Sequence, residues 1–471
     1  MDVAKSTLKV YLAEVGTAVL SFLGIIVFAR ILNASSLGLF FLFQAVVYIL
    51  AMVADFGLQG AIEKRISENK CKAEFAGAGI LLTAIFTSFV SILIWVFKSE
   101  LNSYFGLQSP VLIIIGVFLH NYFILIIKIM SGELHVGDTA ILRFGRSVLW
   151  FLGGLILVWL WRKNASALII SWLVATSVVT VAGFYFVETE LAIPAITHLE
   201  STFSFSIYNF VSSAEWQLYN WVDIVVIGYF VSQAAVGAYE VAWRLTSVVV
   251  LLSQSISMTI FPKISELHSH EKYDEISELV KASLSPAILL IIPGFGGAVV
   301  LSTDLLNYLF GNSYATASVA LSILMGGRLF QAFQGVFGVG VRGINRPDLS
   351  AISNFIALLT NIAMNILLVW KFGIVGAAVA TSISVATNCL LHFYFLQEYV
   401  PIIFPIKQAK WMTVSTIIMC SFLLLLKSIT PVHNAQTLIA FVFAGALIYI
   451  STLFASSEMR RETISVWRTL S

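Results

Sequence analysis

The sequence predicts an all-α membrane protein with about fourteen transmembrane helices. Its composition is 59% hydrophobic and 11% charged, and its mean hydropathy is +0.93, both far from the averages of soluble domains. Apolar stretches of roughly 20 residues, the length that crosses a bilayer core as a helix, follow one another along the chain. The longest polar interruption lies between Phe261 and Ser283. No soluble domain is expected, so the function must rest on polar side chains within the membrane.

The predicted spans follow these apolar stretches in order. Their limits are 8–31, 36–60, 75–97, 110–130, 141–161, 166–188, 204–231, 235–261, 283–302, 315–341, 350–370, 374–397, 409–427 and 436–455. The first stretch is too long for the core of a signal peptide and lacks a convincing cleavage site, so we expect a permanent span. Very short turns predict helical hairpins for the first and second, the seventh and eighth, and the eleventh and twelfth spans.

The distribution of Lys and Arg predicts the orientation in the cell membrane. With the N-terminus inside, the inner segments hold eighteen basic residues and the outer ends and loops hold six. Cytoplasmic segments are enriched in Lys and Arg, so both termini are expected in the cytoplasm. The net charge of +2 gives no indication of nucleic-acid binding. Three scattered cysteines predict neither a disulfide framework nor a metal cluster.

A weak internal repeat predicts the domain organisation. The segment Ala29–Phe40 aligns with Gly228–Tyr239, and Arg65-Ile66-Ser67-Glu68 aligns with Lys263-Ile264-Ser265-Glu266, at offsets of 199 and 198 residues. Chance similarity is the alternative. A true repeat predicts two parallel six-helix lobes, an arrangement known among transporters, at residues 1–203 and 204–398. Residues 399–471 then form two extra C-terminal helices and a cytoplasmic tail.

Acidic residues on polar helix faces are the candidates for ion coupling. Helical spacing places Glu14, Asp55 and Asp223 on polar faces of the first, second and seventh spans. The stripe of the seventh span comprises Ser206, Asn209, Ser213, Gln217, Asn220 and Asp223. A charge in the bilayer costs about 2.5–3.5 kcal/mol, so it usually faces a cavity or a partner. We expect these acids to line a central cavity and to bind H⁺ or Na⁺; the alternative is that each pairs with a basic neighbour and only fixes packing.

The candidates for binding a substrate head group are arginines and amides. They are Arg143, Arg146, Arg244, Arg328, Asn209, Gln217 and Asn220. The planar guanidinium fork suits phosphate oxygens, which predicts an anionic head group. Two alternatives stay open: positive-inside anchoring explains Arg143 and Arg146 equally well, and Glu240 with Arg244 forms an i, i+4 pair that can neutralise itself. No catalytic residue, metal site or cofactor is expected. A soluble active site would need a folded loop domain, ATP hydrolysis would need a phosphate-binding GxxxxGK[ST] loop, and Gly338–Gly343 fits GxGxxG but follows no strand.

Several stretches together resemble a known family. They are FARILNASSLGLFF, VADFGLQGAIEKRIS, WVDIVVIGYFVSQAAVGAYEVAWRL, FPKISEL, LFGNSYATAS and FGIVGAAVATSIS. The chain resembles the polysaccharide-biosynthesis (O-antigen type) flippases of the multidrug/oligosaccharidyl-lipid/polysaccharide exporter superfamily. The resemblance implies two six-helix lobes around a central cavity and alternating access. It also implies movement of a polyprenyl-linked oligosaccharide to the outer leaflet, in several members with ion coupling, and association with glycan-assembly enzymes.

Two other functions compete with this expectation. A multidrug-type cation antiporter of the same superfamily is expected to have an acidic, aromatic cavity, whereas here basic residues accompany the acids. A membrane-embedded glycan polymerase or ligase usually needs a sizeable outer loop, and the outer loops predicted here have roughly 10 residues or fewer, within the usual range of connections. The sequence therefore favours an anionic glycolipid as the transported molecule.

Overall fold

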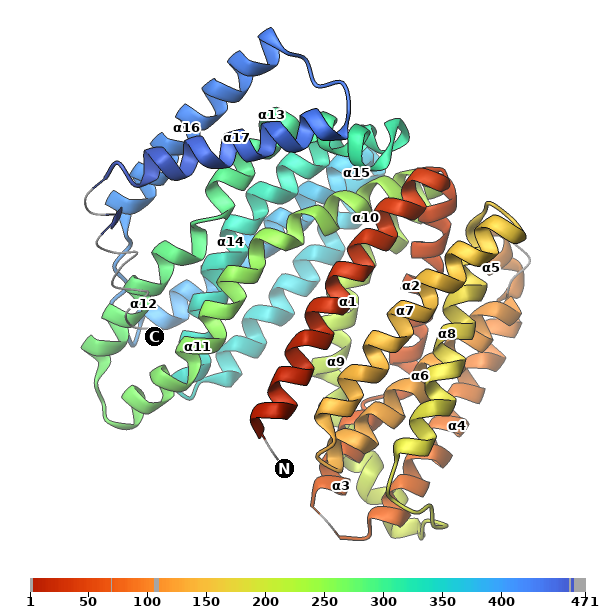
Figure 1. The fold of residues 1–471 in the computed structure, drawn as a ribbon. Helices are drawn as coiled ribbons and strands as arrows, with labels where there is room; N and C mark the ends of the chain where they lie inside the picture. Colours follow the sequence, from red (N-terminus) through yellow and green to blue (C-terminus); the bar gives the residue numbers. More distant parts are fainter. Residues whose placement is uncertain (1–2, 69, 106–109, 457–458, 461–471) are drawn as a thin grey trace. The chain divides into compact units, whose positions relative to one another are not determined.

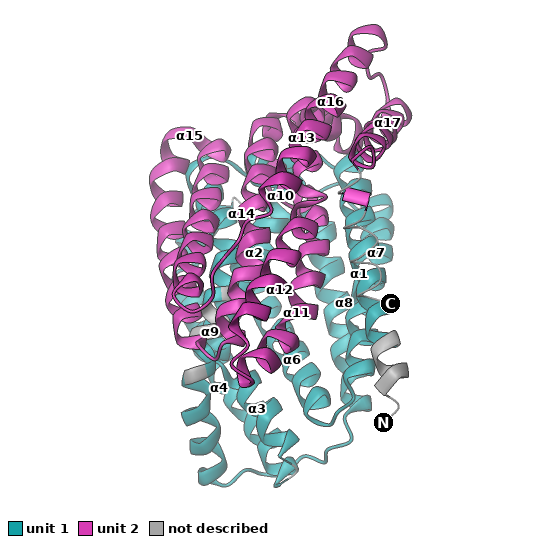
Figure 2. Ribbon diagram, turned by 90° about the vertical axis from the view of Figure 1, so that its left-hand side faces the viewer, with its two compact units in different colours: residues 1–237 teal, residues 238–471 magenta. Residues whose placement is uncertain are grey.

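The computed structural model describes residues 3–68, 70–105, 110–456 and 459–460, in which every regular element is a helix (Figure 1). For residues 3–8, 208, 211–214 and 216, which lie in helices, only the backbone is described. The chain forms two compact units, which we call unit 1 (Met1–Gly237) and unit 2 (Ala238–Ser471) (Figure 2). The predicted boundary between the lobes, at residues 203 and 204, falls within a helix that spans Ile196–Phe230.

Unit 1 contains nine helices and the start of a tenth among the described residues. They are α1 (Val3–Ile31), α2 (Ala34–Asp55), α3 (Leu58–Ser67), α4 (Lys72–Val96), α5 (Lys98–Phe105), α6 (Pro110–Gly132), α7 (Val136–Leu160), α8 (Ala165–Phe186), α9 (Ile196–Phe230) and α10 (Gln233–Ser247). The central helix is α2, because every residue from 37 to 47 is buried and α4, α6, α8 and α9 pack around it. A helix that is apolar on all sides is expected to occupy such a position.

Unit 2 continues from α10. Its further α-helices are α11 (Leu251–Ser269), α12 (Tyr273–Ile288), α13 (Ile291–Leu305), α14 (Ser318–Gly343), α15 (Pro347–Gln397), α16 (Ile406–Ile429) and α17 (Ala435–Leu453). Helix α14 packs against α11, α12, α13 and α15, and α16 packs against α13 and α17. Buried aliphatic and aromatic side chains, among them Ile264, Leu284 and Phe337, form one hydrophobic core between these helices.

The predicted number of fourteen spans is not confirmed, although the difference is small. Twelve described helical segments are long and apolar enough to cross a membrane. Two of the predicted spans, 350–370 and 374–397, lie in α15, which consists of two helices joined at a kink where Gly373 is non-helical (φ 56°, ψ −136°). Hydrogen bonds from Asn388 to Asn354 and between Ser350 and His392 join these two helices side by side, as the predicted hairpin requires. The predicted span 204–231 is helical in α9, but this helix is not among the twelve.

Two predicted boundaries are wrong. The second span was expected to reach residue 60, but α2 ends at Asp55, where Phe56 and Gly57 have positive φ angles of 46° and 79°. The backbone of α9 lies so close that a Cβ on Gly57 would be 2.1 Å from the carbonyl oxygen of Ser206. The eighth span was expected to end at residue 261, but α11 continues through the polar stretch to Ser269, and α12 begins at Tyr273.

The segments aligned by the predicted repeat touch each other through their glycines. A Cβ on Gly38 would lie 1.8 Å from the carbonyl oxygen of Gln233, and a Cβ on Gly237 would lie 2.2 Å from that of Ala34. The contact is reciprocal, because the pairs 34/233 and 38/237 have the same offset of 199 residues in the alignment. Glycine at both positions therefore allows the first turns of α2 and α10 to meet backbone to backbone.

Candidate functional site

A polar cavity of about 650 Å³ lies within unit 1, and we call it the unit-1 cavity. Its volume is in the range of about 300–1,000 Å³ that is usual for small-molecule sites. Helices α2, α3, α6, α7 and α9 contribute its walls. The lining residues are Tyr48, Ala51, Met52, Asp55, Gln59, His120, Asn121, Ile124, Lys128, Arg143, Arg146, Gln217 and Trp221.

Basic side chains outnumber acidic ones in the unit-1 cavity. Lys128, Arg143 and Arg146 line it, whereas Asp55 is the single carboxylate among its lining residues. The two oxygens of Asp55 accept hydrogen bonds from the backbone N–H groups of Gly57 and Gln59, both at 3.1 Å. Asp55 thus satisfies amides at the start of α3, as acidic side chains often do at a helix N-terminus. Its charge is therefore directed at the protein backbone.

Two of the three basic residues have carboxylate partners outside the lining. Nζ of Lys128 lies 2.6 Å from Oε2 of Glu63, and Nη1 of Arg143 lies 3.5 Å from Oε1 of Glu14. The Glu14–Arg143 pair is about half exposed on both sides, so it contributes little to stability. These two ion pairs therefore compensate part of the positive charge of the cavity.

Arg146 differs from the other two basic residues. Its Nη1 is buried and makes no hydrogen bond within the described part of the chain, and its guanidinium lies 4.6 Å from the ring centroid of Phe123. A buried guanidinium donor without an acceptor is costly. An anion that enters the cavity can supply the missing acceptor, and a phosphate oxygen fits the guanidinium geometry.

Aromatic rings also line the unit-1 cavity, and they contribute apolar surface where the cations contribute charge. The ring centroid of Tyr48 lies 4.9 Å from that of Trp221 and 4.7 Å from that of His120. Such rings present flat apolar faces with polar edges. The cavity thus combines anion-binding donors with apolar ring faces, a combination that suits a phosphate attached to a sugar ring.

The structure brings together only some of the predicted site residues of unit 1. Four of them line the unit-1 cavity, namely Asp55, Arg143, Arg146 and Gln217, while Glu14 reaches it only through Arg143. Asn209, Asn220 and buried Asp223 lie on α9 but not in the lining of this cavity. The side chain of Ser213, another member of the predicted stripe, lies outside the described residues.

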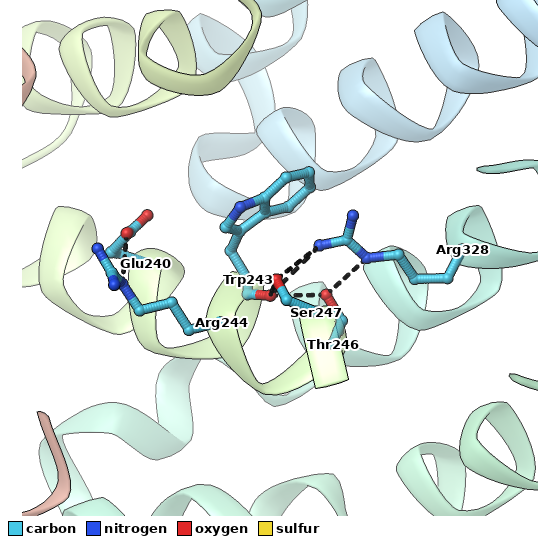
Figure 3. Close-up of polar contacts among 6 residues, drawn as sticks. All are labelled: Glu240, Trp243, Arg244, Thr246, Ser247 and Arg328. Carbon is cyan, nitrogen blue, oxygen red and sulfur yellow. Dashed lines mark hydrogen bonds and ion pairs between the residues drawn. The ribbon is translucent and has the colours of Figure 1, made fainter. Parts of the chain in front are cut away.

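Arg244 of unit 2 forms the intrahelical pair that the sequence offered as an alternative. Its Nε donates to Oε1 of Glu240 at 2.7 Å, one turn earlier in α10 (Figure 3). Glu240 is buried, whereas the side chain of Arg244 is about one-third exposed. The pair neutralises both charges within the helix.

Arg328 is held by groups of its own unit. From α14 it donates to Oγ1 of Thr246 at 2.9 Å and to Oε1 of Gln331 at 2.5 Å. Its Nη2 lies 3.4 Å from the carbonyl oxygen of Trp243, and its guanidinium lies 3.8 Å from a ring centroid of the same residue (Figure 3). With 4% of its surface exposed, Arg328 joins α14 to α10 and has less freedom than Arg146 to bind a ligand.

Several lining residues were not among the predicted site residues, including His120, Lys128 and Trp221. His120 and Lys128 lie within the predicted span 110–130, where an ionisable side chain is itself a sign of a functional site. Trp221 carried no such signal, because an aromatic residue in an apolar helix usually belongs to the core.

Two family profiles match the chain. The profile described as "Polysaccharide biosynthesis protein" matches residues 3–268, more than half of the chain. The profile described as MatE matches residues 209–367.

Known proteins similar to this chain carry flippase names. The chain is 39% identical to the "Probable low-salt glycan biosynthesis flippase Agl15" of Haloferax volcanii, over 98% of both chains. It is 28% identical to the "Probable flippase AglR" of the same organism, over 94% of both chains. Among solved structures, "Lipid II flippase MurJ, inward closed conformation" matches 97% of this chain and 99% of its own, with a TM-score of 0.81 and 16% sequence identity. The last likeness shows that the fold is shared.

Proposed function

The chain belongs to the family of polysaccharide biosynthesis proteins in the multidrug/oligosaccharidyl-lipid/polysaccharide exporter superfamily, and from this premise we propose that it is a flippase. It moves a polyprenyl-(pyro)phosphate-linked oligosaccharide from the cytoplasmic to the outer leaflet by alternating access. The product serves the assembly of cell-surface polysaccharide or glycoprotein glycans. The names and the near-complete coverage of the two Haloferax relatives support this proposal.

The physical problem of such transport is the polar head group. Sugar hydroxyls and phosphates cannot cross hydrocarbon without losing their hydrogen bonds to water. A cavity among membrane-spanning helices replaces those bonds, while the polyprenyl tail stays in lipid. Alternating access requires that both conformations are populated and that the substrate or an ion shifts their equilibrium.

The observation that carries the proposal is the uncompensated guanidinium of Arg146 in the unit-1 cavity. Its buried Nη1 has no acceptor among the described residues, and the cavity that it lines has more cations than carboxylates. We infer that a phosphate of the lipid-linked substrate accepts from Arg146, with Arg143 and Lys128 nearby. The same charge excess disfavours the rival function, export of cationic drugs, because like charges repel.

We further propose that transport is coupled to an ion gradient. The candidates for H⁺ or Na⁺ binding are Glu14, Asp55 and Asp223, because an intramembrane carboxylate can exchange its ion as its surroundings change. Among them, Asp223 is buried on α9 and Asp55 already accepts two backbone hydrogen bonds. The protein then lies in the cytoplasmic membrane with both termini inside and works beside glycan-assembly enzymes.

Reconstitution tests the proposal directly. Purified protein in liposomes receives a fluorescent polyprenyl-pyrophosphate oligosaccharide, and an impermeant reagent that destroys the outer-leaflet label reports its position over time. We expect protein-dependent exchange between leaflets, faster with an imposed H⁺ or Na⁺ gradient and slowed again when an ionophore collapses that gradient.

Two control experiments accompany the assay. Liposomes without protein define the background, and a fluorescent cationic drug tests the rival function in the same vesicles. Folded protein that moves the drug but none of several lipid-linked glycans would contradict the proposed function. An equal rate of exchange with and without an H⁺ or Na⁺ gradient would contradict the ion coupling but not the flippase function.

A further inference from the structure

A second polar cavity lies entirely within unit 2, and we call it the unit-2 cavity. It measures about 570 Å³ and lies where α11 packs against α14. Its polar lining residues are Ser253, Gln254, Ser257, Gln331, Gln334 and Arg342. The volume again lies in the range of about 300–1,000 Å³ of small-molecule sites.

The chemistry of the unit-2 cavity differs from that of the unit-1 cavity. No carboxylate is among its lining residues, and its single cation is Arg342. Amides and hydroxyls dominate, and each of these groups can both donate and accept a hydrogen bond. A sugar hydroxyl has the same dual character, whereas a phosphate only accepts. The unit-2 cavity therefore matches hydroxyl groups better than it matches an anion.

The hydrogen bonds within the protein leave several polar groups of this lining available to bind a ligand. The hydroxyls of Ser253 and Ser257 donate to the carbonyl oxygens of Val250 and Ser253 in their own helix, both at 2.9 Å, so their oxygens still have lone pairs to accept with. Within the described part of the chain, no hydrogen bond is recorded for the side-chain amides of Gln254 and Gln334. Two free amides in membrane-spanning helices are costly unless a polar ligand or water meets them.

Close helix packing fixes the position of these groups. A Cβ on Gly335 would lie 2.9 Å from Oγ of Ser257, and a Cβ on Gly343 would lie 2.5 Å from a side-chain carbon of Ile264. The glycines of α14 thus let α11 approach at both positions. Gln331 is oriented by Arg328, which donates to its Oε1, and this leaves the NH₂ group of Gln331 as a donor.

We propose that the unit-2 cavity is a carbohydrate subsite that binds sugar hydroxyls of the transported glycan, with Gln254 and Gln334 as its main determinants of glycan binding. The inference rests on the proposed function, because sugars reach the cavity as part of the flippase substrate. It goes beyond that function by assigning glycan recognition to residues of α11 and α14 that bear no charge.

The test uses glycan without its lipid or phosphate. Neutral oligosaccharides are released by mild acid from the lipid-linked glycans of the cells that express the protein, and their binding to the full protein in nanodiscs is measured by calorimetry. We expect the Gln254→Leu/Gln334→Leu double variant to weaken binding by about tenfold or more, the effect of losing one to three neutral hydrogen bonds. Gln397→Leu, at the exposed end of α15 and outside the cavity lining, is the matched control and keeps full affinity.

The outcomes separate this inference from the proposed function. Wild-type protein that fails to bind the released glycans, or a double variant that binds them like wild type, overturns the carbohydrate subsite even if flipping is observed. Binding that depends on both glutamines in a protein that flips nothing supports the subsite and contradicts the flippase. Equal loss in the Gln397→Leu control shows a general effect of the substitution and also overturns the assignment.

Discussion

At the scale of single residues, the decisive contrast is between Arg146 and Arg143. Both lie on α7 and line the unit-1 cavity, yet among the described residues only Arg143 has a carboxylate partner, Glu14 at 3.5 Å. We expect Arg146→Gln to raise the KM for lipid-linked glycan by about tenfold or more, since a hydrogen bond to a charged group contributes about 1.5–3 kcal/mol. Arg143→Gln is expected to have a smaller effect, because its charge is shared with Glu14. The flipping assay at varied substrate density measures both.

Arg146→Lys sharpens this prediction. Lysine keeps the charge but loses the planar fork that matches phosphate, so we expect an intermediate KM. A larger effect from Arg143→Gln than from Arg146→Gln, in two variants of equal thermal stability, would place the phosphate elsewhere in the protein.

Some site candidates can be found in the sequence from residue type or helical spacing. An arginine in an apolar span is rare enough to attract attention, and helical spacing places Gln217 on a polar stripe; Arg143, Arg146 and Gln217 line one cavity. The sequence could not foresee that Arg328 is enclosed by Trp243, Thr246 and Gln331. Such enclosure depends on how α14 packs against α10, and no local pattern encodes it.

At the scale of helices, prediction failed where hydropathy continues through a change of backbone direction. The apolar run of the second span passes through Phe56, Gly57 and Leu58 without a polar break, so a window of average hydropathy extends it. Two positive φ angles end α2. They accompany the close contact between Gly57 and α9, and local hydropathy does not reveal this contact. Gly373 in α15 is a case in which prediction succeeded, because the short turn expected between two apolar runs coincides with the non-helical backbone that separates two helices.

The reciprocal contact between α2 and α10 gives the prediction that belongs to this scale. In Gly38→Ala the new Cβ would lie 1.8 Å from the carbonyl oxygen of Gln233, so the two helices must separate. We expect a loss of about 1–3 kcal/mol or more, the usual cost of overpacking. Gly237→Ala, at the aligned position, is expected to behave in the same way. Thermal unfolding of purified protein in detergent measures both changes.

Gly297→Ala is the matched control for these variants. No atom lies within 4 Å of the position of its Cβ, and alanine is favoured over glycine in a helix by about 1 kcal/mol. The midpoint of this variant should be equal to or higher than that of wild type. A Gly38→Ala protein as stable as Gly297→Ala would show that the backbone contact between α2 and α10 does not contribute to stability.

At the scale of the whole molecule, the excess of Lys and Arg in the segments that we assign to the inside predicts the orientation of the protein in the membrane. The native cysteines allow a direct test, because Cys71 is exposed, Cys389 is buried and Cys420 is only partly exposed. A thiol in an apolar setting forms little thiolate and reacts slowly. A membrane-impermeant maleimide should therefore label Cys71 in inside-out vesicles and leave right-side-out vesicles almost unlabelled.

Two variants complete the topology experiment. Cys71→Ser should abolish the labelling of inside-out vesicles, which assigns the signal to one thiol. His433→Cys in that background adds a thiol to the exposed turn between α16 and α17, which the same topology places outside, and it should be labelled only in right-side-out vesicles. The reverse pattern at both sites would invert the protein in the membrane. The unit-1 cavity would then have to take up the substrate phosphate from outside the cell. This result would contradict the proposed transport from the cytoplasmic to the outer leaflet.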